Sequence, residues 1–357
     1  MTSYRYIFGS LRTESIIAEI PLFGTYMDLE LNVGGRFDGS FQLDQTGIDN
    51  QTLIDATIPG RCFVAVERDN APVWVGFIWS RTYQSQSKTF QLYAQSFEKY
   101  PQSELLRSSY NNTADQLEVF KDLWTTMQAV EGRNMNINVP AVAPATVAKT
   151  ITGEPEDFKY YGELMSSLSD TSDGFDWTID VAKSGSFYIK TIRLGYPTLG
   201  TTVGALTFEY PGSVLNYYAT ESMSVAGTHV YTLGTGEGST MISSEYVNQD
   251  LIDAGWPRWD VTASRKDIEN QDNLDSFAIQ EGLIRRAPMM ILKPTMKGDK
   301  VPTFGSFGLG DACKLIIKDP RFPTGKTFQT RITKWSLQPQ SDQNTDEFSL
   351  IFAGDEE

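Results

Sequence analysis

The chain has few residues that bind transition metals or act as soft nucleophiles. Its 357 residues include two cysteines, Cys62 and Cys313, and one histidine, His229. Because these three lie far apart in the sequence, we predict no metal site and no cofactor site. Cys62 follows a Pro-Gly-Arg turn and Cys313 begins an apolar run, so both are expected to be small buried side chains. A disulfide between them remains open.

Long apolar runs are also lacking. No run approaches the roughly 18 to 20 residues of a membrane span. The first residues do not show the charged and then apolar layout of a signal peptide. We therefore expect a protein that is made and kept in solution, with no membrane insertion.

Basic residues are scarce relative to acidic ones. The chain has 30 Lys and Arg against 45 Asp and Glu, a net charge of −15, and the deficit is spread along its whole length. A protein that grips nucleic acid phosphates needs clustered Lys and Arg. We therefore expect no specific nucleic acid binding.

The abundant residues favour a strand-rich fold. Twenty-nine glycines and 16 prolines divide the chain into many short elements. Apolar and polar residues alternate along residues 27–33, 36–43, 62–68, 73–78 and 89–97, with turn residues between them. In the last of these segments Phe90, Leu92 and Ala94 are expected on one face, and Gln91, Tyr93 and Gln95 on the other. Residues 1–100 are thus predicted to form an antiparallel meander or small β-barrel.

The pattern changes to a small α/β insert in residues 101–195. A capping box at Thr113 to Gln116 precedes apolar residues at helical spacing, which predicts a helix over 113–131. A second helix is expected after Pro155, followed by strands at 175–181 and 186–194.

Residues 196–357 are again strand-like, with one expected helix at 273–286 that is capped by Asn273. The predicted fold class is therefore mainly β with an α/β insert. The predicted domains are a first β-barrel (1–100), the insert (101–195) and a second β-barrel with one helix (196–357).

Three motifs suggest chemistry, and each has a simpler explanation. The glycine-rich residues 234–239 resemble a phosphate-binding loop, but Glu237 would repel phosphate and a strand-like segment follows, which favours a hairpin loop. Asp170, Asp173 and Asp176 lack the spacing of a calcium loop and favour a polar turn. The Trp256 to Trp259 segment could stack on sugars or bases, but packing explains it adequately.

No catalytic residue is predicted. His229 would have to serve any histidine-dependent triad, yet it lies in a strand-like segment without a nucleophile motif. Paired carboxylates for sugar hydrolysis cannot be recognised among so many acidic residues. We predict that the protein is not an enzyme.

The order of features resembles the tail-hub group of minor tail proteins in long-tailed phages of actinobacteria, which are related to the baseplate hubs of contractile tails. The residues that carry the resemblance are Pro59-Gly60-Arg61, the strand at 73–78, the strand at 89–97 leading to Leu105-Leu106-Arg107, the loop at 234–239, Trp256-Pro257, the helix near Ala278 ending at Ala287-Pro288, and Gly310-Asp311.

The resemblance implies a structural virion protein at the tail tip, made in the host cytoplasm. It implies two tail-tube-like barrels per chain, and three chains forming a ring that adapts a sixfold tube to a threefold tip. The implied partners are two further copies of the chain, the distal tail or tube protein, the tape measure protein and other tip proteins, with DNA present only in transit.

Two alternatives belong to other functional classes. One is a tail-borne polysaccharide or cell-wall hydrolase, and the other is a module that binds a host receptor. A charge of −15 per chain further predicts that the channel of a ring carries more acidic than basic side chains, so that DNA passes without being held. The simpler explanation is that the acidic residues only maintain solubility.

Overall fold

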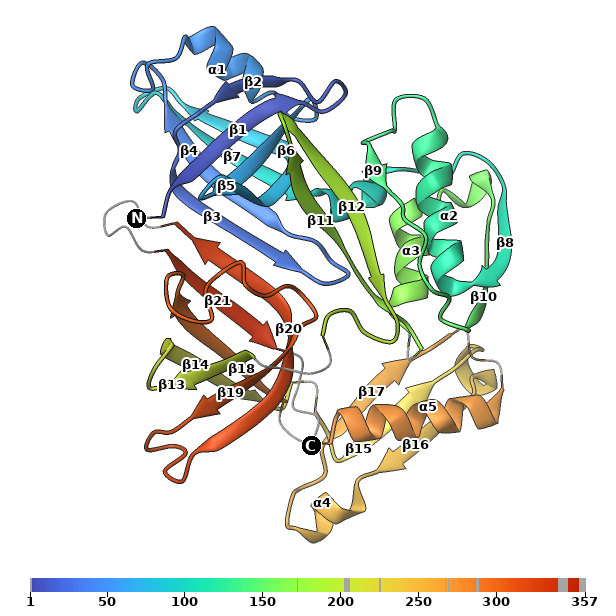
Figure 1. Ribbon diagram of the computed structural model, residues 1–357. Helices are drawn as coiled ribbons and strands as arrows, with labels where there is room; N and C mark the ends of the chain where they lie inside the picture. The colour runs from blue at the N-terminus through green and yellow to red at the C-terminus, as the bar shows by residue number, and fades with distance from the viewer. Residues whose placement is uncertain are drawn as a thin grey trace. The chain divides into compact units, whose positions relative to one another are not determined.

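The computed structural model describes residues 2–171, 173–201, 206–224, 226–266, 268, 270–286, 289–339 and 346–352, without the side chains of 273 and 289–291. The chain divides into two compact units (Figure 1). The larger unit contains Met1–Asn216 and Pro294–Glu357, and the smaller contains Tyr217–Lys293. Within the described residues, no helix is both long and apolar enough to cross a membrane.

Among the described residues, thirteen strands form the main sheet, and eleven of them follow the order β14-β18-β21-β20-β3-β4-β7-β6-β5-β1-β2. The strands are β1 (Tyr4–Ser10), β2 (Ile16–Glu19), β3 (Phe23–Glu30), β4 (Arg36–Gln42), β5 (Cys62–Arg68), β6 (Ala71–Gln84), β7 (Thr89–Ser96), β13 (Leu206–Tyr210), β14 (Val214–Ser222), β18 (Met289–Lys297), β19 (Ala312–Ile317), β20 (Lys326–Gln338) and β21 (Glu347–Phe352). The predicted mainly β fold is confirmed. The two predicted barrels are not confirmed, because no sheet is closed in the described part of the chain.

The first hundred residues form the predicted antiparallel strands. β7 places Phe90, Leu92 and Ala94 in the interior, while Gln91, Tyr93 and Gln95 are exposed or half-buried, as the alternation indicates. A short helix that the pattern did not predict, α1 (Asn50–Ala56), follows β4, and the Asp49 side chain caps it by accepting from the Thr52 N–H. Its seven residues are too few to show a helical period.

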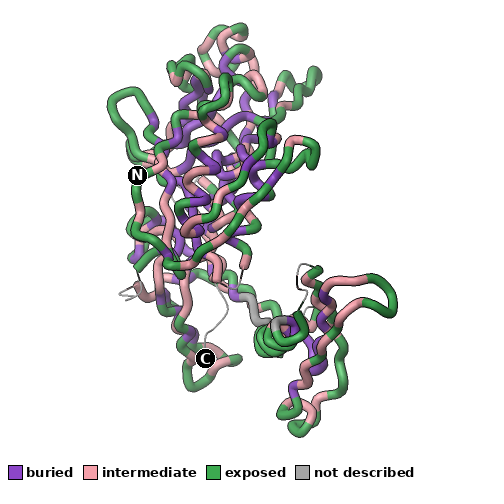
Figure 2. The backbone as a smooth tube through the Cα atoms, turned by 90° about the vertical axis from the view of Figure 1, so that its right-hand side faces the viewer, coloured by how far each residue is buried: buried purple, intermediate pink, exposed green. Residues whose placement is uncertain are grey.

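The strands of residues 1–100 and 196–357 belong to one sheet. β20 pairs with β3 from Lys334↔Glu30 to Leu337↔Met27, and β20 also pairs with β19 and β21. Buried residues gather inside the larger unit, and exposed positions alternate with them along the strands (Figure 2).

The insert contains helices α2 (Gln116–Ala129) and α3 (Tyr161–Ser169), with a pair of strands, β8 (Tyr110–Asp115) and β10 (Ala148–Gly153), and a sheet of β9 (Ile137–Asn138), β11 (Asp176–Ser184) and β12 (Phe187–Gly195). The predicted start of the first helix at Thr113 is wrong. Residues 113–115 pair with β10, and Asp115 is the N-cap. Strand pairing overrides the capping pattern there.

The smaller unit has a sheet of β15 (His229–Leu233), β16 (Ser243–Val247) and β17 (Asp260–Ser264), and two helices, α4 (Gln249–Asp253) and α5 (Gln271–Ile284). The prediction of one helix after residue 196 is wrong, because the structure contains a second one, α4. This helix is a single short turn without an apolar stripe, so the sequence pattern did not indicate it. α5 begins before Asn273, so that residue is not its cap. The division into domains at residues 100 and 195 stays a prediction.

Candidate functional site

Polar side chains predominate on one face of the main sheet across seven neighbouring strands, where the apolar Phe23 and Ile351 also lie. We call it the polar face. All its members are exposed or half-buried except Asp28, which is buried. They are Thr295 and Lys297 on β18, Glu347 and Ser349 on β21, Lys334, Ser336 and Gln338 on β20, Tyr26, Asp28 and Glu30 on β3, Arg36, Asp38, Ser40 and Gln42 on β4, Thr89, Gln91, Tyr93 and Gln95 on β7, and Ser80, Thr82 and Gln84 on β6.

Strand register aligns these side chains in rows that cross the joint between β3 and β20. In one row Thr295 lies opposite Ser349, Ser349 opposite Ser336, and Ser336 opposite Asp28. The hydroxyl oxygens of Thr295 and Ser349 are 3.1 Å apart. The next row places Tyr26, Asp38, Tyr93 and Ser80 side by side. Cross-strand neighbours on one face contact each other, so the polar face is a continuous surface.

The two cations at the centre of this face are paired with acids. Arg36 Nε lies 3.5 Å from Asp38 Oδ2 and 3.8 Å from Asp28 Oδ2. Lys334 Nζ lies 2.9 Å from Glu30 Oε2 and 3.8 Å from Asp28 Oδ2. The buried Asp28 therefore lies between both cations and compensates each of them.

The electrostatics of the cluster follow from burial and these contacts. Burial opposes the charge of Lys334, but the Glu30 and Asp28 carboxylates outweigh it and raise the pKa of the lysine. Arg36 behaves in the same way: burial is outweighed by Asp38 and Asp28, and its pKa is raised. Burial raises the pKa of Asp38 despite Arg36. The cations of this cluster thus stay charged and stay paired at neutral pH.

A close backbone approach holds the β3–β4 turn in place. A Cβ atom at Gly35 would lie 1.8 Å from the Asp28 carbonyl oxygen, so only glycine fits there. That carbonyl accepts from Trp74 Nε1 at 3.0 Å, while Asp28 Oδ1 accepts from the Arg36 N–H at 2.9 Å. Asp28 is therefore fixed by its backbone and by its side chain.

A second contact joins the N-terminal strands to the C-terminal segment. Asp346 is buried, and its Oδ2 accepts from Tyr4 Oη at 2.5 Å and from Arg68 Nε at 2.7 Å. Arg68 also donates to the carbonyl oxygens of Phe304 and Gly298. Burial and the neighbouring Asp346 raise the pKa of Tyr4, so the phenol keeps its proton.

The hairpin of β11 and β12 is anchored to the first strands through Glu67. Glu67 is fully buried, and its carboxylate contacts Lys183 Nζ at 2.5 Å, Tyr188 Oη at 2.6 Å and Arg5 Nη1 at 3.3 Å. Asn32 pairs with Trp177 through its backbone N–H and its side-chain oxygen. These contacts fasten the insert to the first strands.

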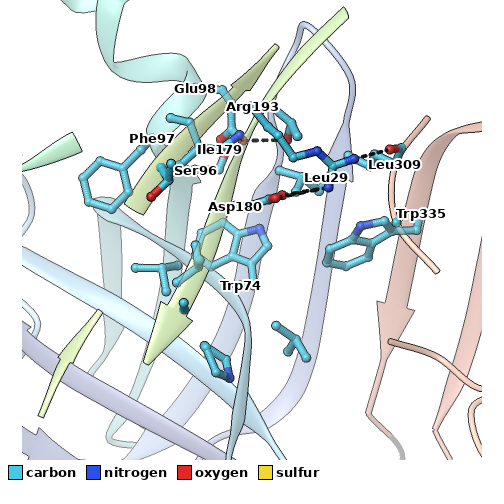
Figure 3. Close-up of a pocket in the computed structure, with 18 of the residues that line it drawn as sticks. Leu29, Trp74, Ser96, Phe97, Glu98, Ile179, Asp180, Arg193, Leu309 and Trp335 are labelled. Atoms are coloured by element: carbon cyan, nitrogen blue, oxygen red, sulfur yellow. Dashed lines mark hydrogen bonds and ion pairs between the residues drawn. The ribbon is translucent and has the colours of Figure 1, made fainter. Parts of the chain in front are cut away.

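A cavity of about 610 Å³ lies in the larger unit, where its three sequence segments meet (Figure 3). Leu29, Trp74 and Glu98 come from the first segment, Asp180 and Arg193 from the hairpin, and Trp335 from β20. The Asp180 carboxylate is 3.1 Å from Arg193 Nη1. Glu98 Oε1 accepts from the Ile179 N–H at 2.9 Å and from Thr178 Oγ1 at 3.1 Å.

We expect the substitution Glu98→Gln to change how stability depends on pH. Burial raises the pKa of Glu98. Folding therefore favours the protonated form, and stability that is present below the ordinary glutamate pKa of about 4.3 is lost as pH rises toward the raised value. Glutamine stays neutral, so the stability of the variant relative to the native chain should increase as pH rises from about 4.3, as measured by urea unfolding.

Glu19→Gln is the matched control for this measurement. The hydrogen bond from Arg5 lowers the pKa of Glu19, so this variant should lose stability relative to the native chain as pH rises. A constant difference between Glu98→Gln and the native chain over the same range would contradict the prediction.

Comparisons with known proteins bear on the fold. No protein-family model matches the chain, and no curated protein matches it. Among solved structures, the tail protein from Neisseria meningitidis superposes on 98% of this chain and 97% of its own, with a TM-score of 0.61 and 10% identity. The 43 kDa tail protein of prophage MuSo2 from Shewanella oneidensis gives 98% and 98%, with a TM-score of 0.61 and 10% identity.

A third structure agrees. The prophage tail protein gp18 from Listeria monocytogenes covers 97% of this chain and 94% of its own, with a TM-score of 0.52 and 9% identity. The chain has the fold of phage tail proteins. The narrower assignment to long-tailed phages of actinobacteria stays a prediction.

Within this tail-protein fold, the glycine-rich residues 234–239 form a hairpin loop, as predicted. They connect β15 with β16, which pair antiparallel. The following strand begins at Ser243 rather than at residue 240, because residues 238–240 form a turn of 3-10 helix. His229 lies in β15, where its Nε2 is 3.1 Å from Glu245 Oε2, so the prediction of a sheet histidine is confirmed.

Asp170, Asp173 and Asp176, at and after the end of α3, make separate contacts. Asp170 caps the C-terminus of α3, and Asp173 pairs with Lys149 Nζ at 2.8 Å. Asp176 is buried on β11, where it accepts from the Leu199 N–H and pairs with Arg331 on β20.

Trp259 is half-exposed beside β17. Ala287 and Pro288 lie outside the described residues.

Cys62 and Cys313 are both buried and free, as the sequence predicts for small core side chains. Burial raises the pKa of the Cys313 thiol to about 12.

The residues that sequence reasoning missed are those of the polar face. Their signal was present in part, since alternation placed Gln91, Tyr93 and Gln95 on one face, but the strands that extend this face are distant in the sequence.

Proposed function

We propose that the protein is a structural subunit of a phage tail, the hub at its distal end, and that three copies form a ring whose channel is lined by the polar face. The observation that carries the proposal is the continuity of this face across the joint between β3 and β20. A sheet with one buried face and one solvent-exposed face is common, but seven strands whose exposed face is mostly polar make a wide polar wall.

The width of the wall fits a conduit. Seven strands at a spacing of about 4.8 Å span roughly 34 Å, so three copies give a circumference of about 100 Å and a channel about 30 Å across. That channel is wide enough for a DNA duplex. Threefold symmetry would also let such a hub adapt a sixfold tube to a threefold tip, which the resemblance implies.

The charges of the polar face suit a polyanion that must pass without being held. Its acids are Asp28, Glu30, Asp38 and Glu347, and its bases are Arg36, Lys297 and Lys334. The lining would therefore be slightly acidic, which supports the predicted excess of acidic side chains. Because Arg36 and Lys334 are each paired with two acids, neither is free to bind a phosphate.

The proposed partners follow from this position in the virion. They are two further copies of the chain, a distal tail or tube protein, the tape measure protein and other tip proteins. The proposed role involves no catalysis and no specific DNA binding.

The mass of the assembled protein tests the proposal. A species of three chains in solution, and a threefold hub in a density map of the tail tip, are the expected results. A hub of another symmetry, or a channel lined by other strands, would refute it. Release of reducing ends or muropeptides from host material would favour a hydrolase, and adsorption to host cells that blocks infection would favour a receptor-binding module.

A further inference from the structure

β6 extends beyond its neighbour at one end of the polar face. β5 pairs with β6 only as far as Phe63↔Phe77, and the Gly60 N–H bonds to the Ile78 carbonyl at 2.8 Å. From residue 79 to residue 84, β7 is the only described strand that pairs with β6. The opposite edge of these six residues is open for hydrogen bonding.

This open edge lacks the usual protection against pairing. Edge strands are commonly shielded by charged side chains, especially lysine, or by proline. The one charged residue of this segment, Arg81, points instead toward α1, where Nη1 donates to the Ile54 carbonyl at 2.6 Å and to Thr57 Oγ1 at 2.9 Å. Trp79 and Tyr83 remain 49% and 45% exposed. The edge therefore offers backbone groups and aromatic surface together.

A second open edge lies at one end of the same sheet. β14 is the terminal strand there and pairs only with β18 among the described strands. It begins with Val214, which is buried, and Leu215, which is 39% exposed, and it contains no lysine, arginine or proline.

We propose that a second copy of the chain occupies the β6 edge, and that residues 79–84 of one copy pair with the start of β14 in the next. The inference rests on the proposed ring and names its subunit contact. Two different edges that join head to tail form a heterologous interface, which closes into a ring when the rotation between copies permits closure and otherwise grows as a filament. Strand addition at an edge gains main-chain hydrogen bonds, and it would continue the sheet from copy to copy.

Cysteine cross-linking tests the pairing. The variant Thr82→Cys/Leu215→Cys, treated with a short bis-maleimide, should give a ladder that ends at three chains. Each single variant should give no linked species, because each edge meets a different edge. Cys62 and Cys313 are 0% and 3% exposed and should not react.

The outcomes separate this inference from the hub proposal. A native trimer whose double variant fails to cross-link overturns the edge pairing and leaves the hub standing. Dimers from Thr82→Cys alone would mean that two β6 edges meet, which overturns the head-to-tail contact. A ladder that ends at another number supports the contact and refutes the threefold hub.

A charge placed at the edge provides an independent test. Thr82→Lys should weaken self-association by about tenfold or more, because a lysine at an edge blocks strand addition. Gln91→Lys is the matched control, since Gln91 is the cross-strand neighbour of Thr82 on β7 and carries the same new charge away from the edge. Equal weakening by both variants, with unchanged unfolding midpoints, would overturn the proposal.

Discussion

Replacing Asp346 with alanine is expected to lower the free energy of unfolding by about 3–5 kcal/mol. Its side chain is 1% exposed and compensates Arg68, whose side chain is 13% exposed. Without the carboxylate, a buried guanidinium and the Tyr4 hydroxyl lose their acceptor. Urea unfolding followed by tryptophan fluorescence measures the loss.

Asp69→Asn is the matched control, because it removes a negative charge beside the same arginine while keeping a residue that tolerates the positive φ and can accept from the Ser3 N–H. The Asp69 side chain is 51% exposed and lies 4.0 Å from Arg68 Nη1. Exposed pairs contribute about 0 to 1 kcal/mol, so this variant should be nearly as stable as the native chain. Similar losses in the two variants would mean that the buried contact does not hold the C-terminal segment to the first strands.

The double substitution Glu30→Gln/Asp38→Asn is expected to make the polar face bind DNA. It removes two of the four acids that balance Arg36, Lys297 and Lys334, so the charge of the face changes from −1 to +1 per chain. In a ring of three chains, the cations that are no longer balanced by these acids would contact successive phosphates and release counterions. Fluorescence anisotropy with a short duplex at low salt should show at least about tenfold tighter binding, which weakens as salt rises.

The control carries the same charge change away from the polar face. Glu118→Gln/Asp180→Asn removes two half-exposed acids that pair with Lys121 and Arg193. If both double variants bind the duplex equally, net charge alone explains the effect. If neither double variant binds the duplex, the acids that pair with the cations of the polar face are not what prevents DNA binding.

Much of the fold is predictable from local sequence. Alternation placed β5 at residues 62–68, and the helix expected after Pro155 is present as α3. The start of α2 was not predictable, because Thr113 to Asp115 fit a helix cap as well as they fit a strand, and pairing with β10 decided between them. Local patterns do not contain that information.

The polar face was predictable strand by strand and not as a surface. The sequence shows that Gln91 and Tyr93 share a face, but nothing local indicates that Lys334 lies beside Glu30. Strand order depends on packing between distant segments. The ion pairs at the centre of the face, which carry its electrostatic properties, therefore emerge only from the three-dimensional structure.

The pairing of β20 with β3 also imposes an order of events on folding. Lys334 and Glu30 are separated by 304 positions. The ribosome releases the N-terminal strands first, yet one edge of β3 stays without its partner until β20 has been synthesised. Contacts between such distant segments form slowly. The nascent chain thus carries an unsatisfied strand edge while these intervening residues are made, and the full surface can be presented to other copies only after β20 has paired.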